Sequence, residues 1–187
     1  HTKADVGTLN SAFAAGARHL THFFNAMTGV HHREFGVAGW ALTNEDVTFD
    51  IIADGMHVRP EMLKFAACSK TPDKVTLISD SVAPTGRGDG EFDLWGEKIV
   101  VENGITRNER GSIAGSVITM LDAVKRMLSL GFSYSEVANM ASLNPAKLLG
   151  IQDARGSIEK GKRADLVVLD GSDLKFVMIN GKTVVEL

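Results

Sequence analysis

The sequence predicts an α/β fold that contains part of a (β/α)8 barrel, on three observations. Short apolar segments rich in β-branched residues end on polar residues, as buried parallel strands do at the face of a barrel that carries active sites. Segments with helical periodicity alternate with them. Only about three such strands are present, whereas a closed barrel needs about eight. We therefore expect 1–155 to be the C-terminal portion of a barrel and 156–187 to supply strands of a small β-sandwich domain.

The barrel portion can be followed in chain order. Its expected elements are a helix over 5–17, a strand over 18–24, a strand over 47–52, a helix over 61–69 with Pro60 in its first turn, and a strand over 75–79. The last strand stops on Asp80, and Pro84 cannot lie in a central strand because it has no N–H to donate. Asp80 is either a carboxylate at the chemical face or a cap of the following turn, and this segment alone does not decide.

The second half of the chain is expected to change character after Asp80. Residues near 85–110 are predicted to form a β insertion with strands over 91–94, 98–102 and 105–107 and turns at 95–97 and 103–104. Helices are predicted over 117–130 with Ser116 as the cap, over 134–143 with Ser133 and Glu136 as a capping box, and from Asn144 to Gly150. The tail is predicted to form strands over 156–158, 165–169, 175–179 and 182–185, with a type I′ turn at Asn180-Gly181.

Composition and charge exclude several kinds of partner. The 187 residues carry a net charge of −3 with 20 scattered Lys and Arg, so neither nucleic acid nor a membrane surface is expected as a partner. The single cysteine, Cys68, rules out an internal disulfide and suits a cytoplasmic protein, and its apolar helical surroundings predict that it packs in the core. The chain begins at His1, directly before a helix, so a piece of a longer protein is expected.

Three histidines and one aspartate are placed where they could share a metal ion. His22 lies at the end of one expected strand, His57 follows another, Asp80 ends a third, and His1 precedes a helix. Imidazoles and a carboxylate at the C-terminal face of a barrel are what a divalent metal such as zinc needs, with one position left for water. One histidine at a strand end is usually structural, but two of them with Asp80 favour a site.

Three other features carry weaker signals. The guanidinium of Arg33 could hold a phosphate or carboxylate through paired hydrogen bonds, although taken alone an exposed loop charge is the better interpretation. The small residues of 111–116 allow a ligand to approach the main chain, but they equally suit an ordinary loop and cap. His19 has odd spacing from His22 along the expected strand, so its side chain is expected on the other face.

Together these stretches resemble the N-acetylglucosamine-6-phosphate deacetylases, a family within the amidohydrolase superfamily. The resemblance covers nearly the whole chain through Thr21-His22-Phe23-Phe24-Asn25-Ala26-Met27, Arg33-Glu34-Phe35-Gly36, Ile52-Ala53-Asp54-Gly55-Met56-His57-Val58, Ile78-Ser79-Asp80, Ile113-Ala114-Gly115-Ser116, Asn144-Pro145-Ala146 with Gly150, and Gly161-Lys162-Arg163-Ala164-Asp165-Leu166-Val167. The last two motifs are common to many amidohydrolases. The first and third are typical of the deacetylases themselves.

The resemblance implies a role for each matching residue. His1 and His22 match the family's metal-binding histidines, and Asp80 matches its catalytic aspartate. The implied substrate contacts are Asn25, Ala26 and Arg33 at the sugar phosphate, His57 from the neighbouring subunit of a homodimer, and Ile113, Ala114 and Gly115 in a substrate-lining loop. The implied cofactor is a divalent metal, Zn²⁺ or Fe²⁺, and the implied ligand is a small amino-sugar phosphate.

The activity that the resemblance implies is metal-dependent hydrolysis of the acetamide of N-acetylglucosamine 6-phosphate to glucosamine 6-phosphate and acetate. A third protein ligand, a glutamate in the family, and a histidine that polarises the carbonyl belong to an N-terminal part that no segment here represents. Ser81 and Phe35 replace a more usual alanine and proline. Two alternatives stay open: an amidohydrolase acting on a cyclic amide or an N-acyl amino acid, and an inert half-barrel that self-associates through exposed strand edges.

Overall fold

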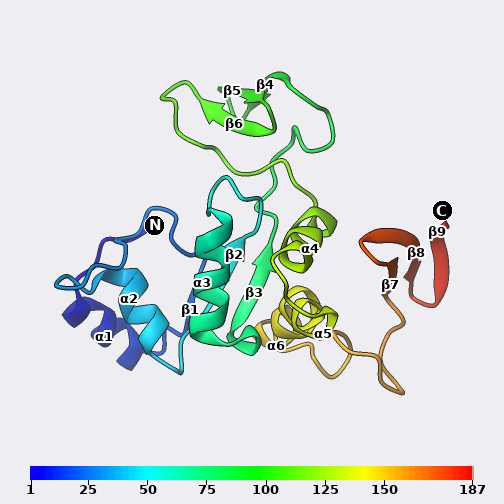
Figure 1. Cartoon of the computed structure of the whole chain (residues 1–187), viewed down its shortest axis with the longest axis horizontal. Coiled ribbons are helices and arrows are strands. Elements are labelled where there is room, and N and C mark those ends of the chain that lie inside the picture. Colours follow the sequence, from blue (N-terminus) through cyan, green and yellow to red (C-terminus); the bar gives the residue numbers. More distant parts are fainter. Residues whose placement is uncertain (187) are drawn as a thin grey trace.

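A three-stranded parallel sheet forms the centre of the molecule, as the computed structural model of residues 1–186 shows (Figure 1). Its strands are β1 (His19–Leu20), β2 (Thr48–Ile52) and β3 (Val75–Ile78), paired in that order. The helices that alternate with them are α1 (Val6–Ala14), α2 (Gly36–Thr43), α3 (Pro60–Lys70) and the 3₁₀ helix η1 (Pro72–Lys74). The predicted α/β class is therefore confirmed.

The two faces of this sheet differ, because successive side chains of a strand point in opposite directions. Phe49 on β2 and Leu77 on β3 belong to the hydrophobic core that the helices cover. Asp50 and its partner in register, Thr76, alternate with these residues and so lie on the opposite face. Both polar residues are nonetheless buried. The core therefore sits between the sheet and its helices, and polar groups are held on the other face.

The first strand is much shorter than the expected 18–24. It ends at Leu20, because His22, Phe24 and Ala26 have positive φ angles of 35°, 75° and 54°. A backbone in this left-handed region turns away from an extended ladder. The segment 18–24, predicted as one long strand, is therefore a two-residue strand followed by a compact turn.

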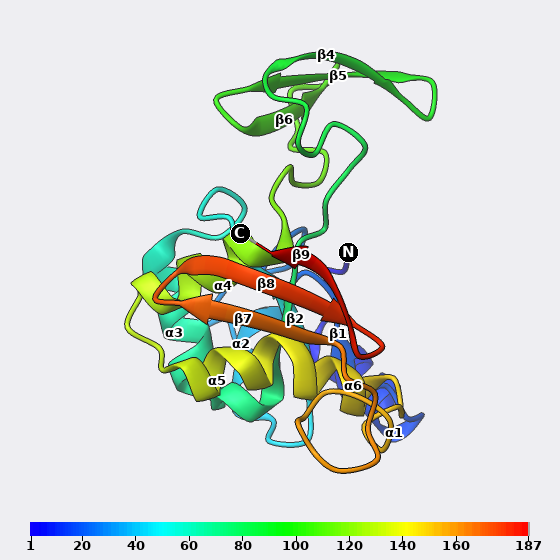
Figure 2. The ribbon, with the colours of Figure 1, turned by 90° about the vertical axis from the view of Figure 1, so that its right-hand side faces the viewer.

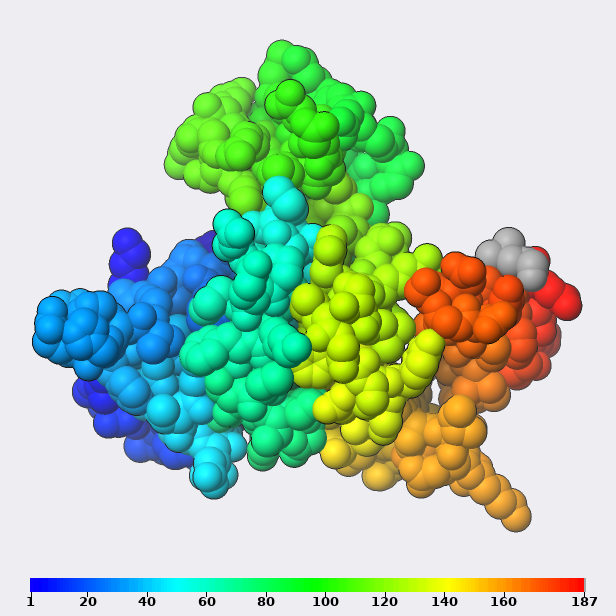
Figure 3. All heavy atoms as spheres, viewed as in Figure 1, coloured from blue at the N-terminus to red at the C-terminus, as the bar shows by residue number. Residues whose placement is uncertain are grey.

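The insertion after Asp80 folds into a separate antiparallel sheet. It contains β4 (Gly90–Leu94), β5 (Glu97–Glu102) and β6 (Ile105–Asn108), each joined to the next by a two-residue turn. Asn103 and Gly104 have φ angles of 52° and 73°, which suits a type I′ turn. Figures 2 and 3 show this sheet as a lobe that projects from the rest of the molecule. The three strands predicted for this segment are confirmed.

The helices after the insertion begin later than predicted. α4 (Met120–Ser129) starts after Thr119, whose side chain forms a capping box with Asp122, so Ser116 is not the cap. Ser116 is instead buried, and its hydroxyl donates to the main-chain oxygen of Ser79. α5 (Tyr134–Ala138), the π-helix η2 (Asn139–Leu143) and α6 (Asn144–Leu148) form one continuous helical segment, and the capping box at Ser133 is confirmed.

Cys68 on α3 is exposed, contrary to the expected packing in the core. Its neighbours Ala66 and Ala67 occupy the buried side of the helix instead.

The tail forms a third sheet, again antiparallel, with β7 (Leu166–Asp170), β8 (Asp173–Ile179) and β9 (Lys182–Glu186). Asn180 and Gly181 have φ angles of 51° and 77°, so the predicted type I′ turn is confirmed. No strand forms over 156–158. Gly156 has a φ of 95° and packs so closely on α6 that an added Cβ would lie 2.7 Å from the Cβ of Ala146.

No closed barrel is present within residues 1–186. Two isolated parallel bridges, Thr2 with Met27 and Ser81 with Ser116, link further segments beside the parallel sheet. The helices in this part of the chain are too short or too polar to cross a lipid bilayer.

Candidate functional site

The structure brings the two predicted metal ligands together. The main-chain N–H of Thr2 donates to the oxygen of Ala26 at 3.1 Å, which fastens the start of the chain to the turn after β1. The imidazole rings of His1 and His22 then lie with their centroids 4.7 Å apart. Nδ1 of His22 is enclosed and makes no hydrogen bond within residues 1–186. A histidine nitrogen with an uncommitted lone pair is the donor that a divalent metal takes.

A carboxylate from the neighbouring strand holds the turn that carries His22. Asp50 on β2 accepts hydrogen bonds from the main-chain N–H of His22 and from the Thr21 hydroxyl at 3.2 Å. His19 Nε2 lies 3.1 Å from the same carboxylate, and its Nδ1 lies 2.8 Å from the hydroxyl oxygen of Thr48. His19 thus lies on the Asp50 face of the sheet, while the His22 ring lies in a turn to which strand alternation does not apply.

Asp80 lies at the end of β3 and is exposed. It has a φ of 48°, and its main-chain oxygen accepts a hydrogen bond from the Ser116 N–H at 2.8 Å. Gly115 passes directly over this point, since a Cβ added there would lie 3.0 Å from the Asp80 oxygen and 2.6 Å from a Val82 methyl carbon. The backbone could not approach so closely with any larger residue. The predicted general base and one end of the predicted substrate loop are therefore neighbours.

The rest of that loop is fixed to the inserted sheet. The buried hydroxyl of Thr106 on β6 accepts from the N–H of Ala114 at 3.0 Å and donates to the oxygen of Gly115 at 2.5 Å. Ile113, next to these residues, is exposed. The inserted sheet thus holds 113–115 beside Asp80.

His57 is held by an aspartate three residues earlier. Its Nδ1 lies 2.6 Å from Asp54 Oδ2, while Asp54 Oδ1 accepts the N–H groups of Met56 and His57, each at 2.8 Å. Burial raises the pKa of the Asp54 carboxyl, but these hydrogen bonds outweigh that effect, so its pKa lies below the usual value. The carboxylate is ionised at neutral pH, so Nδ1 of His57 carries a proton and Nε2 is the atom available to a ligand.

The remaining predicted contacts lie in the turn after β1 and the loop that follows. The amide of Asn25 donates to the main-chain oxygens of His22 and Phe23 at 3.1 and 3.3 Å, so it also stabilises the turn. Ala26 is the left-handed residue whose oxygen binds Thr2. Arg33 is exposed in the loop before α2, and no ion pair involves it within residues 1–186.

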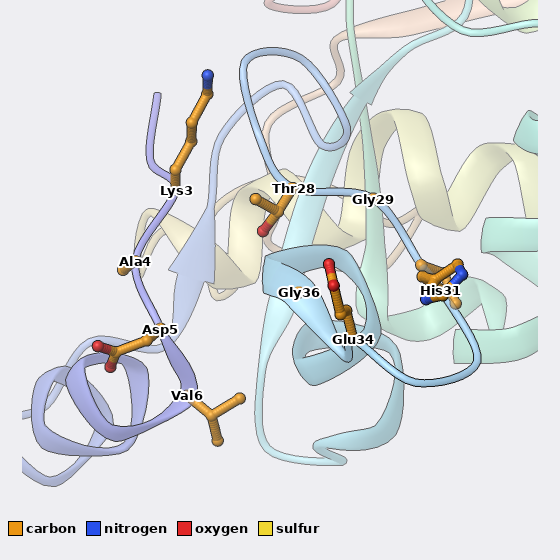
Figure 4. A pocket seen from close by; sticks show the side chains of 10 residues that line it. Lys3, Ala4, Asp5, Val6, Thr28, Gly29, His31, Glu34 and Gly36 are labelled. Atoms are coloured by element: carbon orange, nitrogen blue, oxygen red, sulfur yellow. The ribbon is translucent and has the colours of Figure 1, made fainter.

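An open cavity lies beside this turn and not over Asp80. It has a volume of about 550 Å³, and Figure 4 shows Lys3, Ala4, Asp5 and Val6 on one side and residues of 28–36, including His31 and Glu34, on the other. None of the predicted site residues lines it.

A complete metal site is not present in residues 1–186, where no three His, Cys, Asp or Glu side chains could together hold a metal ion. His1 and His22 fit part of such a site, because they are adjacent imidazoles and one of their nitrogens is enclosed without a partner.

Sequence reasoning missed Asp50 and gave no role to Asp54. Asp54 could have been found, because an aspartate three residues before a histidine in a glycine-containing turn is a common side-chain to main-chain motif. Asp50 offered one signal, a charged residue inside the apolar strand Thr48–Ile52.

Comparisons with known proteins agree with this fold. A model described as "Amidohydrolase family" matches residues 1–184. The chain is 38% identical over 184 residues to an N-acetylgalactosamine-6-phosphate deacetylase of Escherichia coli, covering 97% of this chain and 48% of that protein. It is 39% identical over 179 residues to an N-acetylglucosamine-6-phosphate deacetylase of Bacillus subtilis, covering 95% and 45%.

A solved structure shares the fold. It is a mutant N-acetyl-D-glucosamine-6-phosphate deacetylase from Mycobacterium smegmatis in complex with N-acetyl-D-glucosamine-6-phosphate. The TM-score is 0.92 at 35% identity, and the match covers 99% of this chain and 50% of that chain. The chain belongs to the amidohydrolase family. Within it, the chain is homologous to the deacetylases of N-acetylhexosamine 6-phosphates and spans about half the length of these relatives.

Proposed function

We propose that this chain provides part of the active site of a metal-dependent deacetylase, which hydrolyses the acetamide of N-acetylglucosamine 6-phosphate to glucosamine 6-phosphate and acetate. The observation that carries the proposal is the apposition of His1 and His22 at the end of a parallel sheet, with Nδ1 of His22 enclosed and uncommitted. In this proposal β1, β2 and β3 are consecutive strands of a (β/α)8 barrel, 156–187 belongs to a small β-sandwich domain, and the remaining metal ligand lies outside the residues described.

The proposed chemistry divides between a cation and the residues of this chain. A divalent cation, zinc or ferrous iron, supplies polarisation of the amide carbonyl and makes water easier to deprotonate at neutral pH. His1 and His22 would hold it as neutral imidazoles. Asp80 accepts a proton from the attacking water as the new C–O bond forms, and then gives that proton to the amine nitrogen as the C–N bond breaks. Acetate and the amino sugar phosphate are the products.

The same proposal assigns the substrate contacts. Arg33, an exposed cation in a loop, would bind the 6-phosphate through paired hydrogen bonds. His57, with Nδ1 committed to Asp54, would present Nε2 to the substrate bound in the neighbouring subunit of a homodimer. Asn25 and Ala26 would contact the sugar phosphate, and 113–115 would line the sugar beside Asp80.

A second candidate substrate is N-acetylgalactosamine 6-phosphate, because the similar proteins carry names for both sugars at nearly equal identity. The two sugars differ only in the configuration at C4. The amide and the phosphate, which the proposed residues engage, are common to both.

The test is acetate release by the native protein that contains this chain, with added zinc. The substrates are the 6-phosphates of N-acetylglucosamine and N-acetylgalactosamine, with unphosphorylated N-acetylglucosamine as the control. We expect turnover that needs the phosphate, with the gluco sugar preferred. Asp80→Asn should lower kcat by about 10³-fold, since a general base typically contributes 10²–10⁴-fold.

Equal rates with and without the phosphate would contradict the proposed substrate class and favour a cyclic amide or an N-acyl amino acid. Full activity of Asp80→Asn would contradict the proposed base. A preference for the galacto sugar would establish the second candidate instead.

A further inference from the structure

We propose that Asp50 is a positioning residue that holds the His22 imidazole in the orientation for metal binding, and that His19 and Thr48 hold Asp50 in turn. The proposal rests on the proposed function, because His22 is a metal ligand only there. Asp50 itself contacts neither substrate nor metal in this scheme and acts through the main chain of His22.

The donors to Asp50 all come from one short stretch of chain. The His19 ring, the Thr21 hydroxyl and the His22 N–H converge on the two carboxylate oxygens. In addition, the Phe23 N–H donates to the main-chain oxygen of Asp50 at 2.8 Å. One residue of β2 therefore binds four points along 19–23, and these points surround the residue that carries the predicted ligand.

The backbone of His22 needs such support. Its φ of 35° lies in a region that residues with a Cβ rarely occupy, and Phe24 and Ala26 also have positive φ angles. A conformation of this kind persists only where surrounding groups fix it. A charged acceptor is suited to that task, because hydrogen bonds to a carboxylate are roughly twice as strong as neutral ones.

His19 completes the arrangement, because both of its ring nitrogens are used. Nε2 faces a carboxylate and must therefore carry the proton that it donates. Nδ1 lies 2.8 Å from Thr48 Oγ1 and accepts its hydroxyl proton, and the Thr48 N–H donates to the main-chain oxygen of Arg18 at 2.9 Å. A buried carboxylate in a strand is costly unless its hydrogen bonds are satisfied, and here every partner is supplied by the neighbouring strand or the turn.

The experiment compares Asp50→Leu and Asp50→Asn with the wild-type residue by NMR, each in the native protein that contains this chain. Asp50→Leu removes every side-chain acceptor, whereas Asp50→Asn keeps the volume and one oxygen but loses the charge. Two quantities are measured: hydrogen exchange of the His22 amide without metal, and the zinc dissociation constant from the shifts of the His1 and His22 ring signals. The matched control is Thr76→Val, because Thr76 is the register partner of Asp50 and is buried to a similar extent.

We expect Asp50→Leu to speed exchange of the His22 amide about tenfold or more and to weaken zinc binding about 10–100-fold, the range seen when groups that orient metal ligands are removed. Asp50→Asn should be intermediate, and Thr76→Val should change neither quantity. If Asp50→Leu does not fold, Asp50→Asn decides by itself.

Wild-type exchange and wild-type zinc affinity in a folded Asp50 variant would overturn the proposal. The zinc titration of the wild-type protein separates this proposal from the proposed function. If zinc fails to move the ring signals of the native wild-type protein, the metal site is wrong, while faster His22 exchange in the Asp50 variants still supports the positioning role.

Discussion

The parallel sheet and the C-terminal sheet of this chain are built in opposite ways. In the parallel sheet, β1 and β2 are tied by contacts between residues 28 to 31 positions apart, such as those of Asp50 with His22 and His19, and its core side chains are fully buried. In the C-terminal sheet each strand pairs with the next through a short turn, and every residue of β9 up to Glu186 is exposed. None of the predicted site residues lies in the C-terminal sheet.

The two sheets therefore differ in the interactions that stabilise them. The C-terminal sheet depends on local turn chemistry, which a short sequence window contains. The parallel sheet depends on packing and hydrogen bonds between distant segments, and it can therefore hold residues such as His22 and Asp80 in left-handed conformations that local preference opposes. Predicted site residues gather where distant segments meet.

The largest expected effect is that of Gly115→Ala. The new Cβ would lie 2.6 Å from Val82 Cγ1 at a φ of 76°. Left-handed strain and overpacking together should lower the free energy of unfolding by about 2–5 kcal/mol. Chemical denaturation of the purified variant measures this loss.

Gly111→Ala is the matched control for that prediction. Gly111 has the same φ of 76° but nothing within 4 Å of an added Cβ. Only the backbone strain of about 1–2 kcal/mol should then appear. Equal losses in the two variants would show that close approach to Asp80 and Val82 does not matter.

The sequence predicted the local features well and the long-range ones poorly. The turns at Asn103-Gly104 and Asn180-Gly181 and the capping box at Ser133 are confirmed to the residue, because each depends on a few neighbouring residues. The strand over 18–24 and the cap at Ser116 were wrong, because Asp50 bends the first segment and Ser79 binds the hydroxyl of the second. Neither partner is near in sequence.

The predicted site shows the same contrast between features set by neighbouring residues and features set by distant ones. That His1 and His22 lie together is a long-range fact, and their assignment as a pair of metal ligands came from the resemblance to a known family. Periodicity could place His22 and Asp80 near strand ends, but it could not reveal that Asp50 binds the His22 turn or that Gly115 crosses Asp80. The roles of Arg33 and Asn25 stay predictions.

A smaller and more local effect is expected from Gly181→Ala in the C-terminal sheet. Gly181 has a φ of 77° in the turn between β8 and β9, so a Cβ there should cost about 1–2 kcal/mol. Hydrogen exchange should accelerate in β8 and β9 while amides of β2 and β3 stay as slow as in the wild-type chain. Asn180→Gly, which keeps a residue suited to positive φ, is the control. Faster exchange in β2 as well would mean that the two sheets unfold together.

The smallest expected effect is a change in the pH dependence of stability at Asp54. Because the folded pKa of this carboxyl is below its unfolded value of about 3.9, ionised Asp54 stabilises the fold above about pH 4, and this contribution is lost as the pH falls through the folded pKa. Asp54→Asn should therefore be less stable than the wild-type chain near neutral pH, and the gap should narrow in acid. Urea denaturation at several pH values measures it, with exposed Asp153→Asn as the control. A gap that stays constant into acid would show that the His57–Asp54 contact acts only as a neutral hydrogen bond.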